Sequence, residues 1–423
     1  MQQPESNYLI NAYELSLIPS FIDVLRDSNN ELKDSDAYKY INATNYTTRN
    51  GDKYRILRYN KPMLSLSDIP FYGLLRSVVV NSEGRVVSFA PPKTIPAETF
   101  AKLYLGIKPQ SQFIAPEEFV EGTMINLFWD NVANDWRIAT RSTVEGEVKF
   151  FRDAKKTFRD MFYECVTESG LNISSLDTSY CYSFVIQHPE NRIVTPFQKP
   201  ALILIDAYHI SHNFEANSVK IYTVQRQCLA KMFAHSSVRL PVSYANLQDD
   251  MSSEAWTYTD YIGKLMGLFD NYSCMGVIIR NVCTGERMKL RNPLFEEIKQ
   301  LRGNQPKLQY QYLFLRNKGM IPNYLQHYPE HKKDFSQFRD QVHTFTTILY
   351  QNYVRCYIKK EKPLGEFDHQ FKNHMYNIHQ LYVNELKPNG SYVTNTVVQN
   401  YVNGLHPSQL MYSLNFNMRK RIV

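Results

Sequence analysis

The sequence predicts an α+β protein in which a body of mostly antiparallel sheet is followed by an all-helical C-terminal domain. The middle of the chain consists of short β-branched and aromatic runs separated by turn residues, which is typical of strands. After "RNP" at 291–293 this pattern stops, and apolar residues recur at helical spacing. A length of 423 residues also favours several domains. We predict an N-terminal extension packed on the body (1–60), a sheet domain (61–302) and a basic all-α domain (303–423).

The individual elements follow from local patterns. The N-terminal segment is polar and rich in Asn, Asp and Tyr, and a helix is expected over 12–28. Turn sequences predict two hairpins, one joining 74–80 to 85–90 and one joining 123–129 to 136–142. An amphipathic helix is expected over 153–168, where apolar residues lie three and four apart. Four more strands are expected at 180–186, 201–210, 275–282 and 286–290.

Charge is concentrated at the C-terminal end. The formal net charge is +7, yet residues 303–423 hold 15 Lys and Arg against 7 Asp and Glu, together with 12 of the 30 tyrosines. Basic residues release counterions from nucleic-acid phosphates, and aromatic rings stack on bases. The segment therefore indicates nucleic-acid binding, with Lys359, Lys360 and Lys362 as candidate contacts. A solvated helical surface over a tyrosine-packed core explains the same composition equally well.

Several classes of protein are excluded by what the sequence lacks. No apolar run approaches the roughly 18 residues of a membrane span, and the N-terminus has no basic and apolar signal regions. The six cysteines form no CxxC pair, which predicts reduced, buried thiols rather than a zinc site. His369, His374 and His379 are spaced five apart and do not share a helical face, so no metal site is predicted there.

Four motifs of the body follow one another in a recognisable order. They are "LLRSVVV…GRVVSFAPPKT", "EEFVEGTMINLFWD…WRIATRS", "YSFVIQHPENRIV" and "MGVIIRN…GERMKLRNP". Over residues 55–300 this order resembles the ATP-dependent RNA ligases of the covalent nucleotidyltransferase superfamily, which also includes DNA ligases and mRNA capping enzymes. The helical tail resembles, in architecture alone, that of phage-type RNA ligases. The residues within these motifs are similar to those of ligase-like proteins of large DNA viruses. The resemblance implies a ligase-type nucleotidyltransferase domain over 61–302.

The nucleophile of this family is missing. A Lys-x-Asp/Glu-Gly motif supplies the lysine that attacks the α-phosphate of ATP, and lysine becomes nucleophilic when burial and neighbouring cations lower its pKa. The corresponding tetrad, 119–122, keeps Glu121 and Gly122 but has Phe119 at the lysine position. A phenyl ring cannot form a phosphoramide bond, so the resemblance implies a member without this chemistry.

Two further family positions have lost their carboxylates. The glutamate in the strand before "HPENRIV", which helps to bind metal or ribose, corresponds to Val185, and a later Glu-Gly-x-Val motif begins here with Met275. Divalent metals need oxygen ligands, which neither side chain offers. We expect no bound cofactor or metal, and ATP with Mg²⁺ only if the site is active.

The phosphate-binding cations, in contrast, persist. Arg76, Lys93, Lys289 and Arg291 match cations that the family places near the ribose and phosphates, and with Glu121 and Gly122 they form the candidate nucleotide site. We expect Phe119, Val185 and Met275 to meet in one cleft beside these cations and to fill it with apolar side chains. Each of the four cations is also compatible with an ordinary surface position.

Three hypotheses follow. The first is a nucleic-acid-binding pseudoenzyme on a ligase scaffold, with RNA or another nucleic acid as its partner. The second is an active nucleotidyltransferase with a displaced nucleophile, for which Lys93 or Lys61 is the candidate. The third is a structural protein of viral assembly, with the cleft packed shut. We expect a cytoplasmic protein without membrane contact, in a viral factory or a virion if the viral likeness holds.

Overall fold

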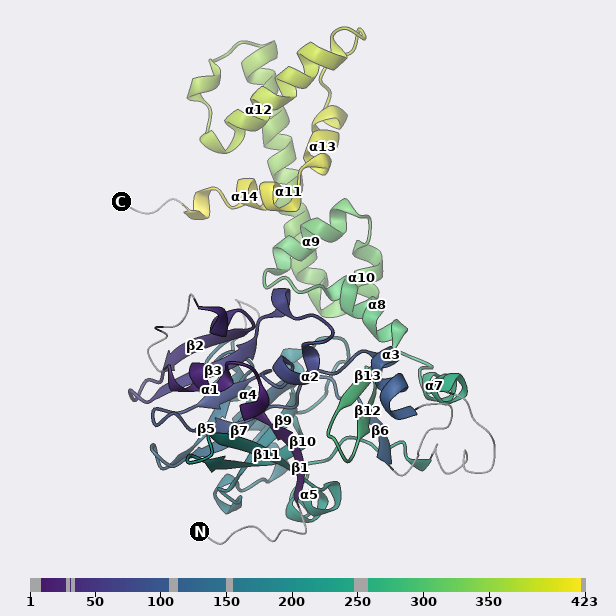
Figure 1. Ribbon diagram of the computed structural model, residues 1–423. Coiled ribbons are helices and arrows are strands. Elements are labelled where there is room, and N and C mark those ends of the chain that lie inside the picture. Colours follow the sequence, from purple (N-terminus) through teal and green to yellow (C-terminus); the bar gives the residue numbers. More distant parts are fainter. Residues whose placement is uncertain are drawn as a thin grey trace. The chain divides into compact units, whose positions relative to one another are not determined.

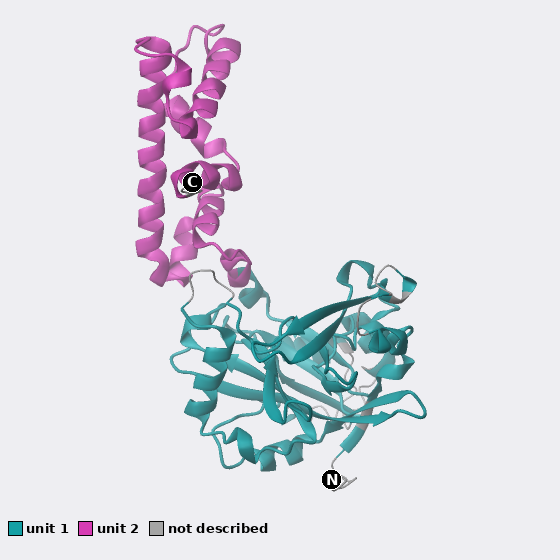
Figure 2. Cartoon of the chain, turned by 90° about the vertical axis from the view of Figure 1, so that its left-hand side faces the viewer, with its two compact units in different colours: residues 1–297 teal, residues 298–423 magenta. Residues whose placement is uncertain are grey.

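The chain divides into two compact units, Met1–Glu297 and Ile298–Val423 (Figures 1 and 2). The computed structural model describes residues 9–27, 31, 35–105, 113–149, 155–246 and 258–419. Unit 1 contains three sheets whose strands pair antiparallel, together with helices at their surfaces, and unit 2 is helical. The predicted α+β fold with a helical C-terminal region is thus confirmed.

The largest sheet of unit 1 has six strands, in the order β1-β11-β10-β9-β7-β8. Their bounds are β1 Leu9–Glu14, β7 Thr123–Asp130, β8 Asp135–Ala139, β9 Tyr180–Gln187, β10 Ala201–Asn213 and β11 Ser218–Val224. In β9, Tyr182 and Phe184 pack against α4 (Phe158–Ser169), whereas Cys181 joins the core on the opposite face. Because side chains alternate across a strand, both faces of this sheet are buried.

Two smaller sheets complete unit 1. A four-stranded sheet, β2-β3-β4-β5, shares a core with one face of the large sheet. A three-stranded sheet, β13-β12-β6, packs against α3 and α7, near which it lies in Figure 1. The bounds are β2 Ile41–Thr47, β3 Lys53–Tyr59, β4 Val78–Val80, β5 Val86–Ser88, β6 Ile114–Glu118, β12 Gly276–Asn281, β13 Arg287–Arg291, α1 Phe21–Arg26, α2 Ile69–Tyr72, α3 Ala97–Phe100, α5 Arg226–Met232 and α7 Tyr258–Met266.

The N-terminal segment differs from the prediction. No helix covers 12–28: residues 9–14 form an edge strand on β11, and helix α1 begins only at Phe21. Pro19 has no N–H to donate, and Ser20 has a φ of 62°, so a continuous helix is interrupted there. The extension predicted at 1–60 supplies β1, β2 and β3 to two sheets of the body, and the two units divide at 297/298 rather than at 302/303.

Unit 2 is built around buried aromatic side chains. Tyr324 and Tyr328 are fully buried, their rings stack 4.7 Å apart, and Phe335 stacks on Tyr324 at 5.0 Å. Its helices are α9 Leu308–Asn317, α10 Ile321–His327, α11 Lys332–Tyr353, α12 His369–Leu381, α13 Asn395–Gly404 and α14 Pro407–Leu414, preceded by α8 Pro293–Arg302 at the division. A tyrosine-packed core therefore accounts for part of the aromatic content of the tail.

A buried ion network fastens the three-stranded sheet to the six-stranded sheet. Arg280 on β12 donates to both carboxylate oxygens of Asp206 on β10, at 2.8 and 2.9 Å, and to Glu117 on β6 at 3.0 Å. Arg226 donates to Glu117 as well, at 2.7 Å. Burial alone would raise the pKa of Asp206, but the charges of Arg280 and Arg226 outweigh it and hold this pKa below its ordinary value.

Replacing Arg280 with methionine should destabilise unit 1 by about 3–5 kcal/mol at neutral pH, because it leaves buried carboxylates without their main counter-charge. The free energy of unfolding in urea measures this loss. Arg85→Met is the matched control: it removes an exposed ion pair with Glu83 and should cost less than about 1 kcal/mol.

Acidification should reduce the difference between the wild type and Arg280→Met. A carboxylate with a lowered folded-state pKa contributes stability above its ordinary pKa, here 3.8, and loses it as the pH falls through the folded value. A stability difference that stays constant from neutral pH down to about pH 3 would contradict this electrostatic account.

Candidate functional site

A pocket of about 530 Å³ lies where strand ends from all three sheets of unit 1 meet. Phe119 follows β6, Val185 lies on β9 and Met275 precedes β12, and all three line this pocket. The remaining lining residues are Tyr59, Lys61, Arg76, Lys93, Thr94, Glu117, Glu118, Val120, Gly122, Met124, Arg141, Ile205, Pro241, Ile278, Arg287, Lys289 and Arg291. The structure thus brings together the three altered motif positions and the four cations singled out in the sequence.

The pocket is open rather than packed shut. The expectation that Phe119, Val185 and Met275 would fill the cleft is wrong, because the space beside them remains. Val185 packs into a small apolar cluster with Val120, Ile203 and Ile205, so it forms the wall and not a plug.

Positive charge dominates the lining of this pocket. Seven cations line it, against the two carboxylates Glu117 and Glu118. Glu117 is held by Arg226 and Arg280, and Glu118 accepts two bonds from Arg239, at 2.6 and 3.0 Å. Sequence reasoning missed two of the cations, Arg141 and Arg287, because neither falls on a motif position that the resemblance had marked. Arg141 lies in the turn after β8, and Arg287 begins β13, two residues before the marked Lys289.

Two of the cations are partly desolvated. Burial, with a smaller contribution from the charge of Arg287, lowers the pKa of Arg76 to about 10. Burial also lowers the pKa of Lys93, and the nearby charge of Lys61 lowers it further. Within the described part of the chain, Lys61, Arg76 and Lys93 form no side-chain hydrogen bond or salt bridge, which leaves their charges directed to the pocket.

The lining does not fit a divalent metal. Phe119, Val185 and Met275 carry no hard oxygen, and Glu117 and Glu118 are already bound by arginines. Among the residues that the structure describes, no group of three or more His, Cys, Asp or Glu side chains could hold a metal ion. The pocket does fit phosphate oxygens, since lysine and arginine bind them directly.

Glu121 and Gly122, which the motif marks as candidate nucleotide-binding residues, both make close contacts within the fold. The Glu121 carboxylate accepts bonds from the backbone N–H groups of Val194 at 2.7 Å and Thr195 at 3.1 Å, and it does not line the pocket. Burial raises its pKa above the ordinary value, against the effect of these hydrogen bonds. Gly122 has a φ of +141°, and a Cβ there would lie 2.3 Å from the carbonyl oxygen of Ile186.

Gly122→Ala should therefore destabilise unit 1 by about 2–4 kcal/mol, through both the backbone conformation and the clash. Thermal or urea unfolding measures the change. Gly263→Ala is the matched control, because a Cβ at this helical position meets nothing within 4 Å, and it should be neutral or stabilising by up to about 1 kcal/mol. Equal effects of the two substitutions would show that close approach does not require Gly122.

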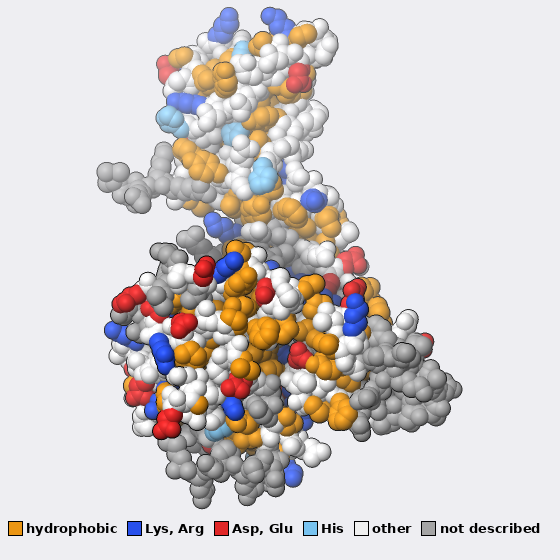
Figure 3. Space-filling view, viewed as in Figure 1, with side chains coloured by type: hydrophobic (Ala, Val, Ile, Leu, Met, Phe, Trp, Pro, Cys, Tyr) orange, Lys and Arg blue, Asp and Glu red, His pale blue; other side chains and the backbone are white. Residues whose placement is uncertain are grey.

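The candidate nucleic-acid contacts of the tail lie in unit 2, and two of them have internal partners. Lys359 lies 3.8 Å from Glu361, and Lys362 donates to the carbonyl oxygen of Glu366 and lies over the ring of Phe367. On the face drawn in Figure 3, the Lys and Arg side chains of unit 2 are scattered and form no single patch. The three lysines, Lys360 included, remain predicted contacts.

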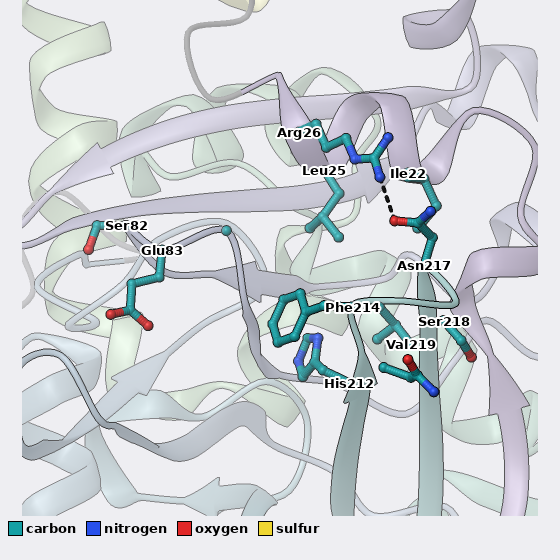
Figure 4. A pocket seen from close by; sticks show the side chains of 12 residues that line it. Ile22, Leu25, Arg26, Ser82, Glu83, His212, Phe214, Asn217, Ser218 and Val219 are labelled. Atoms are coloured by element: carbon teal, nitrogen blue, oxygen red, sulfur yellow. Dashed lines mark hydrogen bonds between the residues drawn. The ribbon is translucent and has the colours of Figure 1, made fainter.

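A second pocket of unit 1, of about 380 Å³, lies between α1 and the turns that follow β4 and β10 (Figure 4). Phe214, 60% exposed, stacks on His212 there, and Arg26 donates to Asn217. This pocket has one arginine and one glutamate, Glu83, in its lining. It therefore lacks the concentrated positive charge of the first pocket.

All six cysteines are free thiols, but only Cys165 and Cys181 are fully buried, so the prediction of buried thiols holds for these two. No helix within the described ranges is both long and apolar enough to cross a bilayer.

An antiparallel α+β body with a helical C-terminal unit, and a cationic pocket at which the ligase-type motifs meet, is consistent with a nucleotidyltransferase-type fold. The chain is similar to an RNA ligase from Rhodothermus phage RM378, with 22% identity over 287 residues, or 62% of this chain and 64% of that protein. This similarity confirms the RNA ligase-like resemblance. The chain spans less than two thirds of the length of that relative, and no family model matches it.

Solved structures similar to this chain include ligases. One is a putative ATP-dependent DNA ligase from Aquifex aeolicus, 13% identical, with a TM-score of 0.40 over 85% of this chain and 81% of that one. An archaeal ATP-dependent RNA ligase, in two forms, is 11% identical, with TM-scores of 0.40 and 0.43 over 95% and 92% of this chain and 99% of that one.

Proposed function

We propose that this protein is a nucleic-acid-binding relative of RNA ligases that holds phosphate groups in its cationic pocket without covalent nucleotidyl transfer. The observation that carries the proposal is that Phe119, Val185 and Met275 line one open pocket together with the four motif cations, Arg76, Lys93, Lys289 and Arg291. The nucleophile and two carboxylates of the ligase pattern are replaced together, whereas the phosphate-binding side chains remain. The similarity to a phage RNA ligase supports a nucleic acid as the partner.

An active enzyme with a displaced nucleophile is the second candidate, favoured by one observation. Lys93 lines the same pocket, and burial lowers its pKa, which increases the fraction of neutral amine. The proposal nevertheless favours binding, because an in-line transfer at this site would lack the carboxylates that hold a divalent metal. Viral assembly stays a prediction, and an open pocket weakens the version of it that requires a packed cleft.

Covalent labelling separates the two candidates. Incubation with α-labelled ATP or GTP and Mg²⁺ or Mn²⁺ should leave the protein unlabelled after denaturing electrophoresis, since Phe119 cannot be adenylated. An active RNA ligase in parallel confirms the assay. Labelling that survives denaturation and disappears in Lys93→Ala would refute the proposal in favour of the enzyme.

Nucleic-acid binding gives the second test. The wild type should bind 5′-phosphorylated single-stranded RNA with an affinity that falls with salt, and Arg76→Gln with Lys93→Gln should lower the slope of log K against log salt by about 1–2. Fluorescence anisotropy measures both. Arg85→Gln removes one exposed cation outside the pocket lining and should leave the slope nearly unchanged.

Neutralising Lys359, Lys360 and Lys362 together tests the tail in the same assay. If these lysines contact phosphates, the slope should fall by about 2, because single strands lose about 0.7 per contact. A slope equal to that of the wild type would remove the tail lysines from the binding surface, while leaving the pocket as the proposed contact.

A further inference from the structure

The charge balance of the pocket distinguishes it from a site that binds a phosphate through a metal ion. A metal-dependent site presents carboxylates to the cation and leaves the phosphate to bridge it. Here seven basic side chains line the pocket, and neither of its two carboxylates is available, because Glu117 is engaged by two arginines and Glu118 by one.

We propose that the pocket binds the terminal phosphates of a nucleotide or nucleic acid directly, without a divalent cation, and that Mg²⁺ weakens this binding. The inference rests on the proposed function and adds the form of its ligand. Lys61, Arg76 and Lys93 take the place that a metal ion has in a catalytic site, since their charges have no carboxylate partner among the described side chains.

The position of these cations supports the assignment. Arg76 precedes β4, Lys93 follows β5 and Lys61 follows β3, so one side of the pocket is formed by the four-stranded sheet and its connections. On the other side are Lys289 and Arg291 of β13, of which Arg291 also forms an ion pair with Glu296. A phosphate chain between them would meet positive charge from both sides, whereas Mg²⁺ would meet side chains of its own sign.

Mg²⁺ therefore competes with the protein for the ligand. Coordination of Mg²⁺ removes two units of negative charge from a phosphate chain, and every cation of the pocket then attracts the ligand less. The burial that lowers the pKa of Arg76 and Lys93 also reduces the screening of their charges by water, which strengthens the effect.

Equilibrium binding to the full-length protein tests this inference with three probes: pyrophosphate, ATP, and a short RNA with either a 5′-phosphate or a 5′-hydroxyl. Each is titrated by calorimetry in EDTA and in excess Mg²⁺ at matched ionic strength. We expect binding in EDTA and an affinity about tenfold lower in Mg²⁺. Preference for ATP over the 5′-phosphorylated RNA identifies a nucleotide as the ligand, and the reverse order identifies a nucleic-acid end.

Substitutions locate the site. Arg76→Gln should weaken binding in EDTA by about tenfold or more, whereas Arg85→Gln, with the same change in net charge outside the pocket, should leave it within about twofold. If Arg76→Gln impairs folding, Lys61→Gln serves instead. Lys61 is exposed, and its substitution removes a charge from the same lining.

Three outcomes overturn the inference. Binding that needs Mg²⁺, or is tightened by it, refutes the metal-free site and leaves the proposed function standing. Absence of binding by every probe in both buffers refutes the inference and the phosphate-binding part of the proposed function together. Equal losses in Arg76→Gln and Arg85→Gln would mean that the anion binds elsewhere.

Discussion

The bidentate ion pair between Arg280 and Asp206, extended by Glu117, is the contact on which the architecture of unit 1 depends. It joins the three-stranded sheet to the six-stranded sheet through side chains that are almost fully buried. The pocket lies between strand ends of these sheets, so the network fixes the distance between its walls. The network also changes the electrostatics of the pocket: Glu117 lines the pocket, but its charge is neutralised by Arg280 and Arg226.

Backbone packing explains why the ligase-type motifs stay recognisable around substituted positions. Gly122 and Gly276 both have positive φ, and a Cβ on either would lie 2.3 or 2.2 Å from a carbonyl oxygen of a neighbouring strand. These glycines are required by the fold whatever the pocket does. Phe119, Val185 and Met275 line the pocket, and Val185 also packs into its apolar wall, so apolar side chains fit these three positions.

The predictable part of the structure is the part encoded locally. The hairpin of β7 and β8 followed from turn residues, and α4 followed from its apolar spacing. The start of α4 did not: the expected start, at 153, lies outside the described residues, but the helix begins at Phe158, after a capping box at Thr157 and Asp160. Strand β1 could not be predicted, because its partner β11 lies about two hundred residues further on and its apolar pattern also fits a helix. Likewise, the motif marked Glu121 as a ligand, but only the tertiary structure shows its carboxylate bound to the backbone of 194–195.

The charge of the lining explains why the pocket stays open although Phe119, Val185 and Met275 are apolar. Closing the pocket would stabilise the fold by about 1.5–3 kcal/mol for each large apolar side chain that it buries. It would also desolvate the seven cations of the lining, which repel one another. Removing even one unpaired charge from water costs more than such a side chain contributes. The surviving cations therefore hold the walls apart, and water or an anion must occupy the space between them. An open cavity lined by seven basic side chains is electrostatically favourable for an anion.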